Sequence, residues 1–213
     1  MSIKGMIFDL DGTLADTMPV CIQAHRRAFE EYLGHSYSDS EIVAMFGPSE
    51  EGIIRSRAGD RAEECLEFFF DEYRRVHVLC SAPFSGVPAL LDTLRSNGVP
   101  LALVTGKGPR SAAISLSLLG LERYFDQVEV GSSAGIIKPT CIRRVLAEWA
   151  VSAHEAAYVG DLPADIRSSR AAGVLAVGAA WAPSADASAL RAQQADVVFE
   201  SIPALQEWIL KRV

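Results

Sequence analysis

The sequence predicts an α/β protein, with a Rossmann-like, doubly wound parallel sheet as its core and a small all-helical domain inserted into that core. Short apolar runs alternate with helix-like segments over most of the chain, a pattern typical of strands covered on both faces. Between residues 16 and 83 the alternation stops and only helical patterns follow one another. A length of 213 residues is sufficient for one core and such an insertion.

The core elements follow in chain order. Strands are expected where the runs are short and apolar, at residues 4–8, 100–104, 127–130, 156–159, 174–177 and 197–199. Helices are expected between them, at residues 87–97, 109–119, 140–149, 163–172 and 203–210. Gly98, Gly120 and Gly173 follow the helical patterns, where glycine accepts the left-handed backbone that ends a helix.

The inserted segment contains four helical patterns, at residues 15–33, 39–46, 49–57 and 61–78. The expected domains are therefore a core of residues 1–15 and 84–213 and a helical domain of residues 16–83.

Composition limits the classes of function. Hydrophobic residues make up 49% of the chain and charged residues 22%, as in an ordinary globular protein. The net charge of −7 and the lack of a basic block argue against nucleic acid or an anionic membrane as partner. No cysteine pair has the spacing of a zinc or thioredoxin-like site. No apolar run reaches membrane-spanning length and no apolar leader is found, so a cytoplasmic monomer or homodimer is expected.

Polar residues stand where the expected strands end, and a parallel sheet binds its ligands at that edge. Asp9 and Asp11 follow the first strand, Thr105 and Gly106 the second, and Asp161 the strand at 156–159. Two further groups open helices, and these are Lys138 and Asp165. Acids two residues apart on extended backbone repel each other unless a cation or proton relieves them.

Four segments in this order resemble the four motifs of the haloacid dehalogenase superfamily of phosphohydrolases. They are FDLDGTLADT at 8–17, LVTGK at 103–107, the pair Lys138-Pro139, and VGDLPADI at 159–166. The helical insertion after the first motif resembles the superfamily's C1 cap. The chain is most similar to phosphoglycolate phosphatase-like members, which implies a hydrolase acting on a small phosphorylated metabolite.

The resemblance implies a role for each motif residue. Asp9 would be the nucleophile that forms an aspartyl-phosphate, and Asp11 would be the general acid and then the general base. Thr105 and Gly106 would bind phosphate oxygens. Lys138 would neutralise Asp9 and the transferring group.

The resemblance also implies Mg²⁺, which prefers hard oxygen ligands. Its expected ligands are the Asp9 carboxylate, the Asp11 backbone carbonyl and Asp161, with Asp165 either a direct ligand or just outside the ligand sphere.

In the inserted helices, His25 is the first candidate for substrate contact, because it lies close to Asp16 and Thr17 in the sequence. Five arginines are weaker candidates, and for each a solvated helix face is the simpler interpretation. They are Arg26, Arg55, Arg57, Arg74 and Arg75. The loop Phe46–Ser49 is expected to help select the substrate.

Several alternatives share this fold. A sugar-phosphate mutase has the same four motifs, and a receiver-like phospho-acceptor module also combines an aspartate with Mg²⁺. A dehalogenase would not need Asp11, Asp161 and Asp165, and a phosphonatase would need a cap lysine, which the chain lacks between Lys4 and Lys107. Phosphoglycolate, pyrophosphate, sugar phosphates and nucleotides remain open as substrates.

Overall fold

The fold was analysed in a computed structural model, which describes residues 2–213. Its centre is a six-stranded sheet in which every neighbouring pair is parallel, with the order β3-β2-β1-β4-β5-β6. The strands are β1 (Gly5–Phe8), β2 (Leu101–Val104), β3 (Gln127–Glu129), β4 (Ala156–Gly160), β5 (Leu175–Ala179) and β6 (Val197–Phe199). The Rossmann-like, doubly wound fold predicted from the sequence is therefore confirmed.

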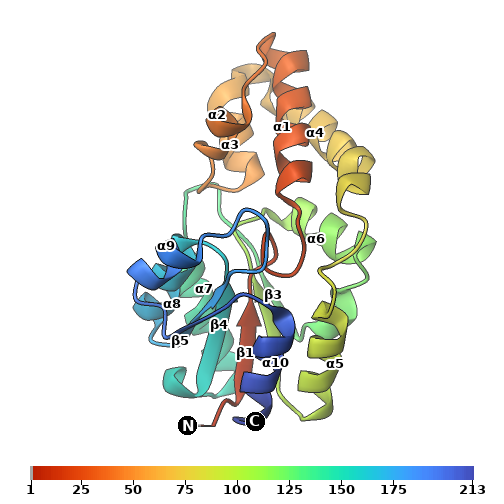
Figure 1. The fold of residues 1–213 in the computed structure, drawn as a ribbon. Helices are drawn as coiled ribbons and strands as arrows, with labels where there is room; N and C mark the ends of the chain where they lie inside the picture. Colours follow the sequence, from red (N-terminus) through yellow and green to blue (C-terminus); the bar gives the residue numbers. More distant parts are fainter. Residues whose placement is uncertain (1) are drawn as a thin grey trace.

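Helices cover both faces of this sheet (Figure 1). One face packs on α7 (Lys138–Trp149), α8 (Pro163–Ala172) and α9 (Ala187–Ala192), and the other on α5 (Val87–Ser96), α6 (Pro109–Leu118) and α10 (Ile202–Leu210). The alternation of side chains assigns β1 residues to opposite layers, since Ile7 packs with α7 while Met6 and Phe8 pack with α5. Burial on both faces explains why each central strand reads as a continuous apolar run.

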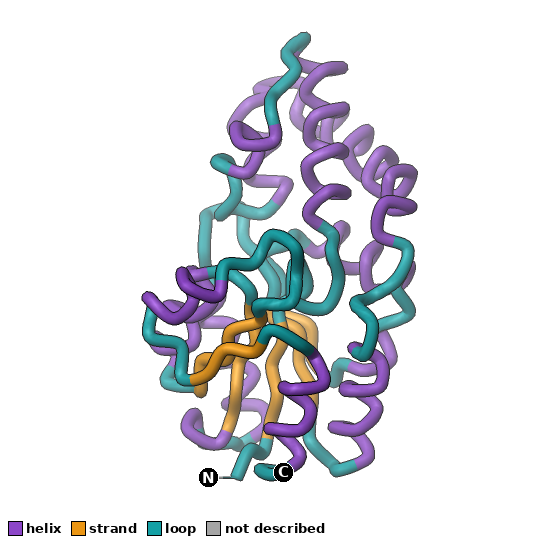
Figure 2. The backbone as a smooth tube through the Cα atoms, viewed as in Figure 1, coloured by secondary structure: helices purple, strands orange, loops and turns teal. Residues whose placement is uncertain are grey.

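The chain between β1 and α5 forms a block of helices beyond the carboxyl ends of the strands. Figure 2 shows this block as purple coils separated by loops from the orange strands. The block consists of α1 (Met18–Leu33), α2 (Asp39–Val43), α3 (Glu50–Ala58) and α4 (Ala62–Val76), with short 3₁₀ turns at Gly59–Arg61 and His77–Cys80. We call it the helical block. Two further 3₁₀ turns, Glu122–Tyr124 and Ala153–Glu155, precede β3 and β4.

Aromatic side chains hold the helical block together. Phe69 is fully buried, and its ring centroid lies 5.2 Å from that of Phe70 and 5.7 Å from that of Tyr73. His25 of α1 stacks on Phe69 at 4.6 Å. The strong apolar stripe of α4 therefore packs against α1, which fixes the position of α1 above the sheet.

Two features place the candidate site. β1 lies between β2 and β4. From β1 the chain adds β2 and β3 on one side and then returns to add β4, β5 and β6 on the other side, so the strand order reverses at β1. Ligands of such sheets bind beyond the carboxyl ends of the strands at that reversal.

Across the part of the chain that the structure describes, no helix is long and apolar enough to cross a bilayer.

Candidate active site

A cavity of about 330 Å³ lies where the carboxyl ends of β1, β2 and β4 meet the helical block. The sheet side of its wall contains most of the residues that the sequence singled out. They are Asp9, Asp11, Gly106, Lys138 and Asp165. The helical block supplies the opposite wall, which includes His25. Residues separated by more than a hundred positions in the sequence are thus brought together at one strand edge.

Asp9 directly follows β1 and is only 3% exposed. The backbone N–H of Leu10 donates to its Oδ1 at 2.8 Å, and Lys138 Nζ donates to its Oδ2 at 2.7 Å. Burial raises the pKa of Asp9 to about 7, and the charge of Lys138 opposes that rise while Asp165 and Asp11 add to it. A carboxylate in this position is fixed in direction by two donors and crowded by like charges.

Three buried acids form a cluster that fits a cation. Ligand oxygens of Asp9, Asp161 and Asp165 all lie within 4.8 Å of one another. Burial, followed by the charges of Asp165 and Asp9, raises the pKa of Asp161 to about 8. Within residues 2–213, Asp161 receives only a long hydrogen bond, from the Thr13 hydroxyl at 3.4 Å. Buried carboxylate oxygens that repel one another are suitable ligands for a hard divalent ion.

Gly12 makes room for this cluster. Its φ of +67° is a backbone conformation that side chains disfavour, and a Cβ at this position would lie 2.1 Å from Asp161 Oδ2. The glycine of the first motif therefore permits both the turn after β1 and the approach of β1 to Asp161.

Lys138 opens α7 and joins two of the acids. Its Nζ lies 2.7 Å from Asp9 Oδ2 and 2.6 Å from Asp165 Oδ1. Asp165 is itself fixed, because its Oδ2 accepts from the Leu162 N–H at 3.0 Å and its Oδ1 from the Tyr158 hydroxyl at 3.4 Å. Although burial favours the neutral amine, the charges of Asp165 and Asp9 raise the pKa of Lys138 well above its usual value.

A second buried lysine, Lys107, was not predicted from the sequence. Lys107 is 3% exposed, and its Nζ lies 3.0 Å from Asp11 Oδ1, 3.8 Å from Glu50 Oε1 and 2.8 Å from the sulfur of Cys21. Burial lowers the pKa of Lys107, but the charges that surround it, with that of Asp11 the largest, raise it well above its usual value. Asp11 also accepts a hydrogen bond from the Thr17 hydroxyl.

Glu50 connects this lysine to the helical block. It stands in the first turn of α3, and its carboxylate accepts from the Gly108 N–H at 2.6 Å and from the Ser111 hydroxyl at 2.7 Å. The loop after β2 and the start of α6 are thereby bonded to the inserted helices. The sequence places Lys107 in the LVTGK motif, but nothing in that motif indicates that its side chain is buried.

A sequence model of the family described as haloacid dehalogenase-like hydrolase matches residues 6–179, a span that contains every residue of this site. The chain belongs to this family. It is therefore a hydrolase, as its resemblance to the superfamily predicted.

Named relatives of this hydrolase support the assignment. A pyrophosphatase PpaX from Bacillus pumilus is 29% identical over 84% of this chain and 84% of its own length. A phosphoglycolate phosphatase from Aquifex aeolicus is 29% identical over 84% of this chain and 85% of its own length. The fold matches that of a haloacid dehalogenase-like hydrolase from Streptococcus pneumoniae with a TM-score of 0.77 at 23% identity, over 97% of this chain and 98% of the other.

The phosphate-binding candidates lie at the end of β2. Thr105 is buried, its N–H donates to the Glu129 carbonyl at 3.0 Å, and its hydroxyl oxygen accepts from the Lys107 N–H at 3.2 Å. The hydroxyl proton remains available for a ligand oxygen. Gly106 lines the cavity. Thr105 itself is not in the cavity wall and lies directly before Gly106, so the structure brings only Gly106 of this pair to the cavity.

His25 is in the cavity wall, as the sequence suggested, but it is 1% exposed and packed among phenylalanine rings. Burial lowers the pKa of His25 to about 4, so the ring is neutral at physiological pH. Its Nδ1 lies 2.8 Å from the Cys21 carbonyl oxygen, which can only accept, so Nδ1 carries the proton. Nε2 is then a bare acceptor, and no protein group in residues 2–213 donates to it.

The five arginine candidates lie outside the cavity wall. Each is engaged elsewhere on the helical block. Arg26 binds Asp39, Arg55 binds Glu63, Arg57 bonds Ser56, Arg74 binds Asp71, and Arg75 binds Glu72. Their interpretation as solvated surface residues is the one that fits the structure. The loop Phe46–Ser49 does reach the cavity, through Phe46, Gly47 and Pro48.

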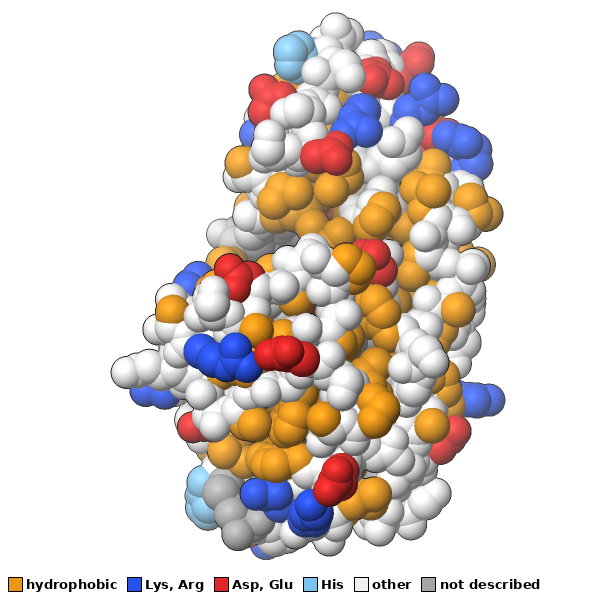
Figure 3. Space-filling view, viewed as in Figure 1, with side chains coloured by type: hydrophobic (Ala, Val, Ile, Leu, Met, Phe, Trp, Pro, Cys, Tyr) orange, Lys and Arg blue, Asp and Glu red, His pale blue; other side chains and the backbone are white. Residues whose placement is uncertain are grey.

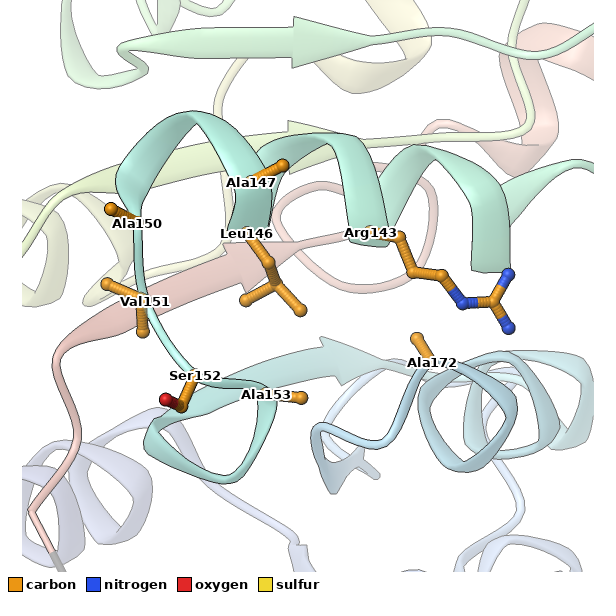
Figure 4. A pocket seen from close by; sticks show the side chains of 8 residues that line it. All are labelled: Arg143, Leu146, Ala147, Ala150, Val151, Ser152, Ala153 and Ala172. Atoms are coloured by element: carbon orange, nitrogen blue, oxygen red, sulfur yellow. The ribbon is translucent and has the colours of Figure 1, made fainter.

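A second hollow is unsuited to the same chemistry (Figure 4). It lies between the end of α7, the turn before β4 and the end of α8, at the opposite edge of the sheet. Alanines form much of its wall, and its one charged residue is Arg143, which bonds the Ala171 carbonyl. Among residues 2–213 no acid lines it, so it lacks the cluster of carboxylates found at the carboxyl ends of the strands.

Proposed function

We propose that this hydrolase is a Mg²⁺-dependent phosphomonoesterase that acts through an aspartyl-phosphate on Asp9. The observation that carries the proposal is the arrangement around Asp9, a buried carboxylate with one lysine at 2.7 Å and two further acids within 4.8 Å. Phosphoryl transfer depends on positioning and on neutralising charge, and this arrangement supplies both. The names of the relatives, a pyrophosphatase and a phosphoglycolate phosphatase, agree with this class of reaction.

In the first step, a carboxylate oxygen of Asp9 attacks phosphorus and the bond to the leaving oxygen breaks. The Leu10 N–H and Lys138 hold the carboxylate in one orientation, so little rearrangement is needed before attack. Lys138 also reduces the repulsion between Asp9 and the approaching phosphate, since its position beside Asp165 and Asp9 keeps it protonated.

Asp9, Asp161 and the backbone carbonyl of Asp11 would hold Mg²⁺. Asp165 Oδ1 accepts from Lys138 at 2.6 Å, so Asp165 orients this lysine and is either a further ligand or lies just outside the ligand sphere. When bound, Mg²⁺ supplies positive charge at the phosphate oxygens as a Lewis acid. Thr105 and the Gly106 amide bind the remaining phosphate oxygens.

Asp11 donates the proton to the leaving oxygen and later takes one from the water that hydrolyses the aspartyl-phosphate. It lies in the same cavity as Asp9, and Thr17 and Lys107 fix its side chain. Thr17 directly precedes α1, so the orientation of Asp11 is tied to the start of the helical block.

Residues 16–83 are proposed as a cap domain over a core of residues 1–15 and 84–213. Its contact with the core includes the Ser49 N–H, which donates to the Ser132 carbonyl at 2.9 Å, and the Glu50 bonds already described. A cap in this place would exclude water from the cavity during transfer.

The test is hydrolysis of p-nitrophenyl phosphate by the purified protein with Mg²⁺, with EDTA, and with Mg²⁺ restored. Asp9→Asn preserves size and removes the nucleophilic charge, so it should abolish turnover. Glu148→Gln, on α7 outside the cavity wall, is the control that should retain turnover. Turnover that survives both EDTA and Asp9→Asn would refute the proposal.

A further inference from the structure

The cavity wall beyond the catalytic acids is largely apolar. Six large apolar side chains contribute to it from both the helical block and the core, namely Met18, Val43, Phe46, Ile53, Ile136 and Leu162. Three of them are unusually open to solvent, since Val43 is 43% exposed, Ile136 62% and Leu162 50%. Figure 3 shows hydrophobic side chains gathered on one face near the junction of the helical block and the core. Apolar side chains grouped around a cavity mark a surface built to bind apolar atoms.

Each cation in the cavity wall is already paired with two carboxylates. Across residues 2–213, the cavity is lined by two lysines and by no arginine. Lys138 is shared between Asp9 and Asp165, and its remaining role is the transferring phosphate. Lys107 is shared between Asp11 and Glu50, and a second anion would have to compete with both carboxylates for it. An anionic leaving group would therefore lie against apolar side chains with no unshared cation to pair with, at the cost of part of its hydration.

His25 does not supply the missing charge. Its ring is neutral, and the donor at Nδ1 is already committed to the Cys21 carbonyl. Its other ring nitrogen, Nε2, is a buried acceptor that no protein donor in residues 2–213 satisfies, and it supplies no positive charge to the cavity.

We infer that the substrate is a phosphomonoester whose leaving group is small, uncharged and mainly apolar. This inference rests on the proposed function and specifies its substrate class. It separates the chain from the relatives named for pyrophosphate and phosphoglycolate, because those substrates release phosphate and the carboxylate glycolate. It also disfavours a sugar bisphosphate, the intermediate of the mutase alternative, whose second phosphate would face the same apolar wall.

Two matched substrate pairs test the inference. The first is 2-phosphoglycolate and its amide, carbamoylmethyl phosphate, which differ in charge but hardly in size. The second is 4-carboxyphenyl phosphate and phenyl phosphate, in which the carboxylate also makes the better leaving group, so a preference for phenyl phosphate would have to come from binding. We expect kcat/KM for the neutral member of each pair to be at least about tenfold higher.

A variant links the preference to the wall. Val43→Lys places a cation there at an exposed position, and it should move the neutral-to-anionic ratio of kcat/KM toward the anionic member by about tenfold or more. Val78→Lys, at a residue 78% exposed and outside the cavity wall, is the control and should leave the ratio unchanged.

The outcomes are distinct. Equal rates within each pair, or preference for the anionic members, would overturn the inferred substrate class while the proposed function stands. If the neutral-to-anionic ratio of kcat/KM is unchanged in Val43→Lys, the apolar wall is not the cause of the preference for neutral substrates. Absence of Mg²⁺-dependent turnover for all four substrates and for p-nitrophenyl phosphate would overturn both the proposed function and the inference that rests on it.

Discussion

Replacing Lys107 by methionine tests the buried ion network that joins the core to the helical block. Methionine has a similar length and keeps the apolar stem, but it removes the charge that lies 3.0 Å from Asp11 and 3.8 Å from Glu50. The side chain of Lys107 is 2% exposed and that of Glu50 is 7% exposed, so the Glu50 carboxylate would stay buried without its cation, whereas Asp11, at 20% exposed, keeps partial access to water. Breaking a buried pair from one side costs about 3–5 kcal/mol.

The assay is thermal unfolding at neutral pH in the presence of EDTA. For a chain of this size each kcal/mol lowers Tm by about 2–4 °C, so Lys107→Met should lower it by roughly 6–20 °C. Adding Glu50→Gln should recover part of that loss, because the glutamine oxygen can still accept from the Gly108 N–H while its amide nitrogen can donate to the Ser111 hydroxyl oxygen, and no buried charge is left.

Lys4→Met is the matched control, since Lys4 forms an exposed pair with Glu155 and its loss should leave Tm close to that of the wild type. A Lys107→Met protein that melts within about 2 °C of the wild type, or a double variant no more stable than the single one, would refute the argument that this network is buried and charged.

Two further predictions concern the acid cluster. Burial raises the pKa of Asp161 to about 8, so in EDTA its protonation stabilises the fold at low pH, and that contribution is lost as pH rises through 8. The difference in Tm between Asp161→Asn and the wild type should therefore shift in favour of the variant as pH rises from 5 to 8.5. The variant should also no longer be stabilised by Mg²⁺. A Tm difference that is constant with pH would contradict this prediction. Gly12→Ala should lower stability by at least about 1 kcal/mol and raise the half-saturating Mg²⁺ concentration, because its Cβ would displace Asp161. Gly34→Ala, at φ +65° with open space around the Cβ, should lower stability alone, and equal Mg²⁺ affinity in the two variants would refute the steric role of Gly12.

The core of the fold could be predicted from the sequence because the central strands β1, β2 and β4 are buried on both faces and therefore appear as unbroken apolar runs. The strand expected at residues 127–130 forms β3, which is an outer strand of the sheet. Val128 in it is 43% exposed, so this segment contains fewer apolar residues than the central strands. The same reasoning located Asp9 and Asp161, because a parallel sheet brings the ends of its strands to one edge.

The network around Lys107 could not be found in this way. Its partner Cys21 is 86 positions away in the chain, and Glu50 bonds to Gly108 across 58 positions. Both contacts depend on how the helical block packs over the sheet, and no local periodicity encodes that packing. Glu50 has the position of an ordinary acid in the first turn of a helix, so its local sequence gives no reason to expect burial.

The arginines of the helical block were candidates in the sequence, but the structure places them outside the cavity wall. A positive charge on an inserted helix is compatible with binding an anionic substrate, but helical spacing also pairs it with acids three positions away, as for Arg74 with Asp71 and Arg75 with Glu72. Only the tertiary structure distinguishes the face that reaches the cavity from the face that meets solvent. His25 and Phe46 are on the first face, and these arginines are on the second.

The central claim is that Asp9 becomes phosphorylated, and trapping that species tests it most directly. An Asp11→Asn variant should accumulate the aspartyl-phosphate, because p-nitrophenolate leaves without a proton from the enzyme whereas hydrolysis of the intermediate needs the base. The reaction would be quenched in acid within one turnover, reduced with borohydride and analysed by peptide mass spectrometry. The account predicts homoserine in place of aspartate at position 9 and none in the Asp9→Asn/Asp11→Asn control. Release of nitrophenol with an unmodified Asp9, or with the modification at another residue, would contradict it.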